Sequence, residues 1–195
     1  EGKNIFWHYS SHIMSIAVKM LFPETNLAIG ASIGEGFYYD FEPVKPFVPD
    51  DLKKIEQKMR EIVKQDLPFE RSAMKKEAVI EFYRRRNENY KMELARDIPD
   101  EEVSIYRTGD FVDLCLGPHI PSAGYLTAFK LLSLAGAYWR GDSKQAMLTR
   151  IYGISFPTED ELKDYLKRIE EAHKRDHRKL GQDLELFSFF EEAGA

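Results

Sequence analysis

The sequence predicts an α+β fold with a mainly antiparallel sheet, packed helices and a long C-terminal connecting helix. Three observations support this prediction. Strand patterns follow one another between residues 103 and 156, after several helical patterns, and do not alternate with them. Residues 26–42 mix glycines with β-forming side chains, which is typical of a hairpin. A segment rich in charges of both signs follows Thr158, as expected of a helix that connects domains.

The first helix is predicted over residues 7–22. Apolar residues recur there at helical spacing until Pro23, which ends the pattern. His8 and His12 lie four residues apart on a neighbouring face. One side of this helix can therefore pack in a core while another lines a cavity.

The next segments mix one hairpin with further helices. The hairpin at 26–42 leads through a proline-rich connection to a helix that Asp50 is expected to cap. Residues 68–73 look extended, and two shorter helices are expected at 76–86 and 89–95. The first half of the chain is therefore predicted to be mostly helical.

The second half is predicted to supply most of the strands. Gly136 is expected to divide two strands of one hairpin, and Thr158 with Glu161 forms a capping box that starts the last helix, which is expected to reach about Leu180. The predicted strands cover residues 103–107, 111–116, 128–134, 137–140 and 147–155.

Length and composition limit the class of protein. The chain has 195 residues, of which 43% are hydrophobic, enough for one large domain with an appendage. No apolar run approaches a membrane span, and no signal segment is seen, so we expect no membrane partner. The single cysteine excludes an internal disulfide and favours a reducing, cytoplasmic location. Because the first residue is Glu1, we expect a piece of a longer protein. The net charge of −5 disfavours extensive binding to a nucleic-acid backbone.

Two motifs of reactive side chains lie far apart in the sequence. His8 and His12 form an H-x-x-x-H motif, and Cys115 and His119 form a C-x-x-x-H motif. A Gly-Pro pair prevents a helix through the second motif, which is expected to be a strand end that runs into a turn. If this strand end meets the first helix, three imidazoles and the only thiol of the chain line one pocket.

Three interpretations of this pocket remain open. Histidine and cysteine are preferred ligands of zinc, and four such ligands would close a structural site unless one of them withdraws. A metal-free hydrolytic pocket, in which imidazoles and a lysine move protons, is the second interpretation. A polar network in the core, without chemistry, is the third. Two spaced motifs together favour a functional site over the polar network.

Three further side chains are candidates for the same pocket. Asp113 lies two residues before Cys115, so on a strand it faces the same side, where it could orient an imidazole or bind an ammonium group. A surface salt bridge is the simpler alternative for Asp113. Tyr39 could offer its hydroxyl to a substrate or be a core tyrosine, and Lys91 would by default be a surface lysine. Cys115 could be a nucleophile, although the sequence shows no activating dyad.

The two motifs and several longer sequence segments resemble a known family. The paired motifs resemble the editing domain shared by threonyl- and alanyl-tRNA synthetases, and the segments resemble bacterial threonyl-tRNA synthetases in particular. These segments are residues 28–30, 36–40, 112–119, 136–142, 150–153 and 175–181. The resemblance implies an editing domain at 1–156 and a linker helix at 157–195 that leads to an absent aminoacylation core. No ligase activity is therefore expected from this piece.

The resemblance implies hydrolysis of mischarged seryl-tRNA(Thr). Serine lacks one methyl group of threonine, which a synthetic site can discriminate by only about 1–3 kcal/mol, so a second site must remove the wrong ester. His8 matches the histidine that positions or activates water, Lys91 the lysine that shares proton transfer, and Asp113 the carboxylate that holds the seryl amino group. Matches to the rest of the pocket, and to a tyrosine near the substrate, are His12, Cys115, His119 and Tyr39.

The resemblance also implies cofactor and partners. Alanyl relatives hold zinc at the four motif positions, whereas the threonyl site works without metal, so we expect no required cofactor, with Zn²⁺ possible at His8, His12, Cys115 and His119. The expected partners are the acceptor end of tRNA(Thr) carrying serine and the remaining domains of a homodimeric parent synthetase. Two alternatives remain open: a non-catalytic tRNA-binding or interdomain module, and a zinc-dependent ester hydrolase.

Overall fold

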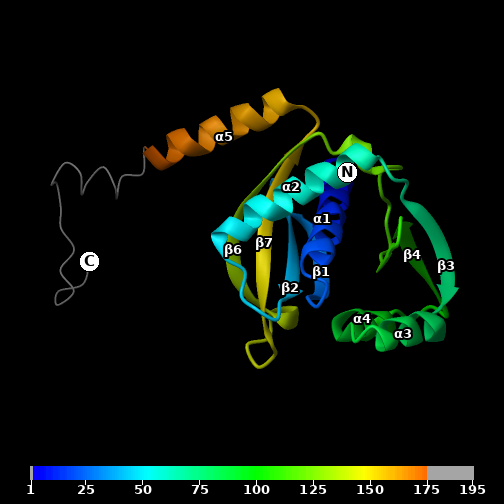
Figure 1. Cartoon of the computed structure of the whole chain (residues 1–195). Coiled ribbons are helices and arrows are strands. Elements are labelled where there is room, and N and C mark those ends of the chain that lie inside the picture. The colour runs from blue at the N-terminus through cyan, green and yellow to red at the C-terminus, as the bar shows by residue number, and fades with distance from the viewer. Residues whose placement is uncertain (1, 175–195) are drawn as a thin grey trace, which may run out of the picture. The chain divides into compact units, whose positions relative to one another are not determined.

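The computed structural model of the chain describes residues 2–174 (Figure 1). It divides into two compact units, of which the first ends at Pro157 and the second begins at Thr158. The first unit combines helices with antiparallel strands, so the predicted α+β class is confirmed. No helix among the described residues is long and apolar enough to span a bilayer.

Most predicted elements are found close to their expected positions, although α1 begins earlier than predicted. The helices are α1 (Gly2–Leu21), α2 (Pro49–Gln65), α3 (Lys76–Arg85), α4 (Asn89–Asp97) and α5 (Glu159–Lys174), with short 3-10 turns η1 (Ala123–Tyr125) and η2 (Trp139–Gly141). The strands are β1 (Asn26–Ile33), β2 (Gly36–Glu42), β3 (Glu70–Lys75), β4 (Glu102–Thr108), β5 (Phe111–Leu114), β6 (Ala128–Tyr138) and β7 (Met147–Phe156).

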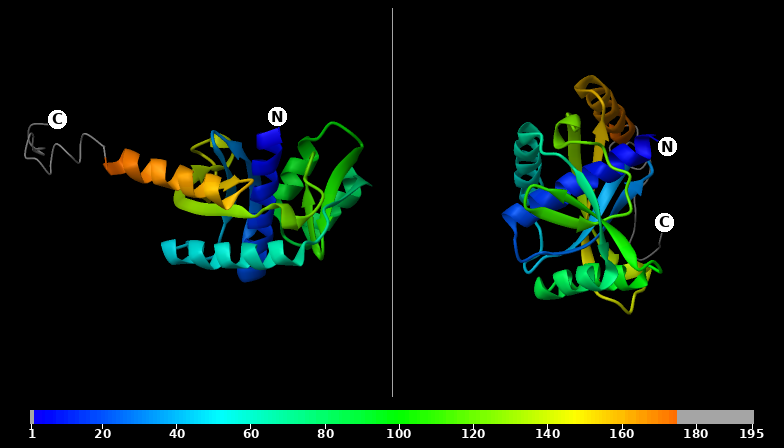
Figure 2. Two further views of the ribbon diagram at one scale, coloured as in Figure 1. Left: turned by 90° about the horizontal axis from the view of Figure 1, so that it is seen from above. Right: turned by 90° about the vertical axis from the view of Figure 1, so that its right-hand side faces the viewer.

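The strands of the first unit form two antiparallel sheets. The larger sheet has the order β1-β2-β7-β6, and the smaller one has the order β3-β4-β5. Figures 1 and 2 show α1 and α2 lying over one face of the larger sheet, with the smaller sheet and α3 and α4 beside it. The predicted antiparallel pairing is therefore confirmed, but the strands divide between two sheets.

Two hydrophobic clusters fix the elements that later carry the site. In the first, α1 packs against β2, whose Phe37, Tyr39 and Phe41 are fully buried on one face by the two-residue period of a strand. Full burial of such a side chain stabilises the fold by about 1.5–3 kcal/mol. In the second cluster, Val79 of α3 and Ala95 of α4 pack on the smaller sheet. This second cluster holds α4 against β4 and β5.

The predicted hairpin at Gly136 is wrong. Strand β6 runs without a break from Ala128 to Tyr138, and Gly136 pairs with Thr149 inside the ladder to β7. The chain turns later, where Arg140 adopts a φ of 56° and Gly141 a φ of 74°. Strand β6 is at the edge of the sheet, and its ladder to β7 is enough to keep Gly136 extended, so this glycine does not mark a turn.

The predicted cap at Asp50 is also wrong. Val48 is the residue that caps α2, and its backbone N–H donates to Asp51 Oδ2 over 3.0 Å. Pro49 occupies the first helical position, where its missing N–H costs nothing. Asp50 instead lies in the first turn, where a carboxylate is favoured by the helix dipole.

The second unit begins with the predicted capping box. Thr158 Oγ1 accepts the Glu161 backbone N–H over 3.3 Å, and Glu161 Oε2 accepts the Thr158 N–H over 3.2 Å. Helix α5 is described as far as Lys174, so the predicted continuation towards Leu180 and the segment at 175–181 lie outside the described residues. The assignment of 1–156 and 157–195 to a domain and a linker helix stays a prediction.

Candidate functional site

Helix α1 carries the first motif into the interior. Its side chains from Tyr9 to Val18 are all buried, so the helix is enclosed on every side and His12 is only 4% exposed. His8 lies one turn earlier and is half-buried. The hydroxyl of Ser11 donates to the His8 carbonyl over 2.6 Å, and the hydroxyl of Ser15 donates to the His12 carbonyl over 2.9 Å. The buried serines thus satisfy polar groups inside α1 without leaving their own hydroxyls unpaired.

The second motif lies immediately after β5. The Cys115 N–H donates to the Ser104 carbonyl over 3.3 Å, and the Ser104 hydroxyl donates back to the Cys115 carbonyl over 2.6 Å. Gly117 then adopts a φ of 70°, a left-handed conformation that glycine takes without steric cost. The chain reverses there and carries His119 back towards Cys115, as the Gly-Pro pair predicts.

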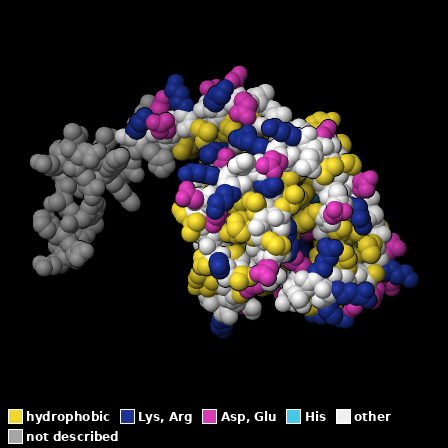
Figure 3. All heavy atoms as spheres, in the orientation of Figure 1, with side chains coloured by type: hydrophobic (Ala, Val, Ile, Leu, Met, Phe, Trp, Pro, Cys, Tyr) yellow, Lys and Arg dark blue, Asp and Glu magenta, His cyan; other side chains and the backbone are white. Residues whose placement is uncertain are grey.

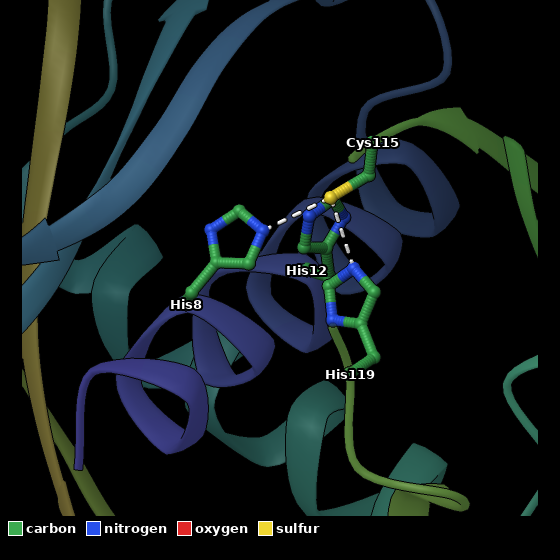
Figure 4. A group of neighbouring side chains, drawn as sticks. All are labelled: His8, His12, Cys115 and His119. Carbon is green, nitrogen blue, oxygen red and sulfur yellow. Dashed lines mark hydrogen bonds between the residues drawn. The ribbon is translucent and has the colours of Figure 1, made fainter. Parts of the chain in front are cut away.

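The two motifs meet around the thiol (Figure 4). His8 Nε2 lies 3.0 Å from Cys115 Sγ, and His119 Nε2 lies 3.1 Å from the same sulfur. The ring of His12 stands edge-on to both other imidazoles, with centroid distances of 4.8 Å to His8 and 4.4 Å to His119. One ligand atom from each of the four residues lies within 4.8 Å of the others.

A buried ion-pair network adjoins this cluster. Lys91 Nζ lies 2.6 Å from Asp113 Oδ1, and His12 Nδ1 lies 2.9 Å from Asp113 Oδ2. The Tyr39 hydroxyl donates a longer bond of 3.4 Å to the same Oδ2. Lys91 and Asp113 are only 4% and 2% exposed, so the surface-lysine and surface-salt-bridge alternatives are wrong. His12 links the network to the thiol because it contacts Cys115 as well as Asp113.

The start of α4 places Lys91 in this network through Glu88, a residue that no sequence pattern indicates. Glu88 immediately precedes α4 and is buried. Its carboxylate accepts the Leu27 backbone N–H over 3.1 Å and pairs with Lys19 of α1. Glu88 therefore ties α4 to α1 and to β1, the elements that surround Lys91.

Two cavities meet at Lys91. The first, of about 360 Å³, contains four of the predicted residues, namely His8, His12, Lys91 and Cys115. The second, of about 350 Å³, is also lined by Lys91, and in addition by Asp113. Other walls of the first cavity, which sequence reasoning missed, are Ile29, Gly30, Leu94, Ile98, Leu114, Leu116 and Gly117.

The predicted residues therefore differ in their access to a ligand. Tyr39 is fully buried, and neither Tyr39 nor Asp113 lines the first cavity. His119 is half-buried and does not line this cavity either, and its ring stacks on His8 with ring centroids 5.0 Å apart. A bulge in β1 between Leu27 and Gly30 brings the missed glycine to the cavity, and only the glycine-rich composition of the hairpin could have indicated it.

The cluster stabilises a thiolate beside an imidazolium. Burial raises the pKa of the Cys115 thiol, but hydrogen bonds from three histidines outweigh it and lower this pKa to about 3. Burial lowers the pKa of His12, but its hydrogen bonds to Asp113 and Cys115 outweigh it and raise this pKa to about 9. At neutral pH the Cys115 sulfur is therefore anionic and His12 is cationic.

Burial also shifts two neighbouring groups. It lowers the pKa of His119, so this imidazole is neutral at pH 7. It raises the pKa of the Asp113 carboxyl, but the charges of Lys91 and His12 outweigh it and hold this pKa well below its usual range. A thiolate only accepts hydrogen bonds, so His119 must donate from Nε2. Its lone pair is then on Nδ1, a buried atom with no protein partner among the described residues.

The donor set suits a zinc ion. Three imidazoles and one thiolate are the ligand types that zinc prefers, and tetrahedral zinc keeps such atoms about 3.3–3.6 Å apart. The two sulfur contacts of 3.0 and 3.1 Å are slightly shorter than this spacing, and all four ligand atoms lie within 4.8 Å of one another, so side-chain adjustments would be needed to close them around one ion. Asp113 would orient His12 as carboxylates commonly orient zinc-bound histidines.

Residues 103–152 match the family described as "Threonyl and Alanyl tRNA synthetase second additional domain". This segment contains Asp113, Cys115 and His119 but not the two histidines of α1.

The whole chain is similar to part of several curated proteins named "Threonine--tRNA ligase". It is 59% identical to that of Carboxydothermus hydrogenoformans over 98% of the chain, 56% identical to that of Oleidesulfovibrio alaskensis over 100%, and 55% identical to that of Caldanaerobacter subterraneus subsp. tengcongensis over 98%. The chain spans 30% of the length of each of these relatives. The resemblance that the motifs predict is thereby confirmed.

Proposed function

We propose that this chain, which is similar over nearly its whole length to one part of the threonine–tRNA ligases, is an editing module that hydrolyses seryl-tRNA(Thr). The observation that carries the proposal is the cavity in which His8, a thiolate-centred histidine cluster and the buried Lys91 come together. A metabolic need for such a module follows from chemistry, because a single methyl group gives weak discrimination in one binding step.

The proposed substrate is the ester between serine and the terminal ribose of tRNA(Thr). A cavity of about 360 Å³ has room for a seryl group and part of the ribose. Apolar walls from α4 and from the segment after β5 would limit the space left for an extra methyl group. The remaining domains of a homodimeric, cytoplasmic parent synthetase would supply most of the affinity for tRNA. Consistent with this, basic and acidic side chains are interspersed on the face of the first unit seen in Figure 3.

His8 is the proposed base for the attacking water. If Nε2 of neutral His8 donates to the Cys115 thiolate, the lone pair of its imidazole is on Nδ1. The Nδ1 atom takes a proton from water as the water oxygen bonds to the ester carbonyl carbon. Cys115 in this scheme sets the tautomer of His8 and is not a nucleophile.

Lys91 is the proposed acid for the leaving group. As the bond between the carbonyl carbon and the ribose oxygen breaks, the Lys91 ammonium gives that oxygen a proton, and His8 holds the proton taken from water. Asp113 keeps Lys91 and His12 in place through contacts of 2.6 and 2.9 Å. The expected role of Asp113 in binding the seryl ammonium group would require that group to displace Lys91 or Tyr39, since Asp113 is buried behind them.

A metal-free reaction is the preferred form of this proposal. His8, His12, Cys115 and His119 would hold a zinc ion if one bound, and zinc would supply a Lewis acid there. Four protein ligands would, however, leave no position for water and would occupy the imidazole of His8. A zinc-dependent ester hydrolase, favoured by the same donor set, is therefore the second candidate function.

The test is a deacylation time course with the purified chain. Ser-tRNA(Thr) and Thr-tRNA(Thr) are incubated side by side with the wild type, His8→Ala and Lys91→Ala, and with Lys54→Ala as a control for removal of an exposed lysine. We expect rapid loss of serine only, unchanged activity in the control, and at least a hundredfold slower reaction in either pocket variant, the scale on which a proton-transfer group contributes. Unimpaired hydrolysis by a folded His8→Ala/Lys91→Ala variant would refute the assignment.

A further inference from the structure

The outer face of the larger sheet carries an aromatic and cationic surface that the pocket chemistry does not use. Tyr38 of β2 and Tyr152 of β7 are cross-strand neighbours with ring centroids 6.4 Å apart. The guanidinium of Arg150 lies 3.9 Å from the Tyr38 ring centroid and 5.9 Å from that of Tyr152. All three residues are half-buried, so part of each side chain reaches the surface.

This surface is held rigidly. Asp40 is buried and accepts two hydrogen bonds from Arg150. Arg150 Nε donates to Asp40 Oδ1 over 2.7 Å, and a terminal guanidinium nitrogen donates to Asp40 Oδ2 over 2.8 Å. On the neighbouring strand β6, the residues paired with Tyr152 and Arg150 are the exposed Ser133 and Ala135. Small side chains beside the rings leave the planes open from that side.

The surface lies on the same side of the sheet as Leu94, a residue that lines the first cavity. Leu94 of α4 lines that cavity and also packs against the buried cluster of Ala28, Tyr90, Trp139 and Leu148, to which β7 contributes Leu148. Leu148 and Arg150 alternate by two residues on β7, so they share one face of the sheet. Leu94 therefore connects the cavity with the face that carries Arg150.

Strand register brings the two features next to each other. The β1 bulge falls between Leu27, which pairs with Phe41, and Gly30, which pairs with Tyr39. Ile29, which is 38% exposed and lines the cavity, therefore lies beside the segment of β2 that carries Asp40, the partner of Arg150. Tyr38 pairs with Ala31 on the same edge strand. Because neighbouring strands lie about 4.8 Å apart, a chain that crosses β1 from the aromatic surface arrives at the cavity wall.

From this continuity we propose that Tyr38, Arg150 and Tyr152 form a stacking surface for the unpaired nucleotides that precede the esterified adenosine of the RNA. The inference rests on the proposed function, which requires a single-stranded RNA end at the cavity. Aromatic rings and guanidinium planes accept bases of any sequence by stacking, and a sheet face is a common support for them. Arg150 acts here mainly as a flat surface, since Asp40 balances its charge.

The test compares a long and a short substrate. Ser-tRNA(Thr) offers the preceding nucleotides, whereas seryl-adenosine, the ester on a single nucleoside, does not. We expect Tyr38→Ala and Tyr152→Ala to raise KM for Ser-tRNA(Thr) by about tenfold, within the range for loss of one stacked base, and to leave KM for seryl-adenosine unchanged. Tyr38→Phe should restore the wild-type KM, because the ring is retained. Tyr125→Ala, which removes an exposed tyrosine elsewhere, is the matched control.

A binding measurement separates failure of this inference from failure of the proposed function. A fluorescent RNA trinucleotide ending in adenosine is titrated against the wild type and the same variants, without any hydrolysis. Weaker binding by Tyr38→Ala and Tyr152→Ala, about tenfold in Kd, supports the stacking surface even if no ester is cleaved. Equal Kd values, or an equal rise in KM for both substrates, would overturn it. Wild-type failure to hydrolyse either ester, with the binding difference intact, would overturn only the proposed reaction.

Discussion

Lys91 Nζ of α4 lies 2.6 Å from Asp113 Oδ1 of β5, and the two side chains are 4% and 2% exposed. A buried charge is tolerated only when an opposite charge and hydrogen bonds replace its water shell. Asp113 receives these from Lys91, His12 and Tyr39. The pair therefore couples the folding of the first unit to the arrangement of its cavity.

Removal of the Lys91 ammonium is predicted to destabilise the fold. Lys91→Met keeps most of the side-chain volume but leaves the Asp113 carboxylate with one cationic partner, and loss of one member of a buried pair costs about 3–5 kcal/mol. Urea unfolding at pH 7 measures the free energy of unfolding. Lys54→Met, which removes an exposed lysine that pairs with Asp51, is the control and should unfold nearly like the wild type. Equal midpoints for both variants would contradict the prediction.

Gly117 is predicted to be required by both backbone and packing. Its φ of 70° disfavours any other residue, and an added Cβ would overlap the hydroxyl of Tyr106. Gly141 has a similar φ of 74° but open space around it. We expect Gly141→Ala to cost about 1 kcal/mol and Gly117→Ala about 2 kcal/mol or more, as measured by thermal unfolding.

A double variant checks the cause of the Gly117 effect. If overlap with the phenol hydroxyl contributes, Tyr106→Phe should recover part of the stability lost in Gly117→Ala and should do nothing for Gly141→Ala. The Gly117→Ala/Tyr106→Phe variant should also recover part of the deacylation activity lost in Gly117→Ala, because the turn at Gly117 carries His119 back to the thiol. Additive losses in the Gly117→Ala/Tyr106→Phe variant would show that backbone strain alone is responsible.

The imidazolium–thiolate pair predicts a specific dependence of stability on pH. The pKa of the Cys115 thiol is lowered to about 3. Its contribution to the free energy of unfolding is therefore complete above pH 9 and decreases as pH falls towards 3. The pKa of His12 is raised to about 9. Its contribution to the free energy of unfolding is therefore complete below pH 6.5 and is lost as pH rises to 9. Between pH 6.5 and 9 the two slopes have opposite signs and cancel. Between pH 5 and 6.5 the thiol still makes stability rise with pH, and so does His119, whose pKa is lowered.

Urea unfolding between pH 5 and 9 measures this balance. The wild type should gain stability up to pH 6.5 and then stay level. Cys115→Ser lacks the thiolate, so its stability should rise less below 6.5 and should fall between 6.5 and 9 through the His12–Asp113 contact. One proton corresponds to at most about 1.4 kcal/mol per pH unit. Parallel curves for the two proteins would refute a charged pair at this position.

Local patterns in the sequence predicted most of the fold. Helical periodicity located α1, α3 and α4 because each buries one or more faces against a core, and the capping box at Thr158 is a contact between near neighbours. The turn at Gly136 was wrong because a glycine inside a strand and a glycine at a turn have the same local signal. Only pairing with β7, a long-range property, distinguishes them.

The sequence predicted which residues meet at the candidate site, but not how deeply Lys91 and Asp113 are buried. Paired motif spacing indicated that His8 and Cys115 meet, since each motif has its own local geometry. The burial of Lys91 could not be derived, because it depends on Glu88 and Lys19 closing α4 against α1. Nor could the position of Asp113 behind the first cavity, which follows from how the smaller sheet packs beside α1.

Metal removal is predicted to leave the reaction intact. If His8 must offer a free lone pair to water, then zinc held by His8, His12, Cys115 and His119 blocks the base and fills every position on the metal. Chelator-treated, folded protein should therefore deacylate Ser-tRNA(Thr) at the full rate, and one equivalent of added zinc should slow it.

Calorimetric titration and thermal unfolding measure zinc binding without relying on activity. The wild type should bind one ion and unfold at a higher temperature with it, because a ligand that binds only the folded state stabilises that state. Cys115→Ser should bind zinc far more weakly, since it loses the thiolate ligand, whereas Lys54→Ala should match the wild type. If chelation instead abolishes deacylation by folded protein and zinc restores it, the metal-free scheme fails. The Cys115 thiolate would then be a zinc ligand, and one bond to the ion would replace its three hydrogen bonds from imidazoles.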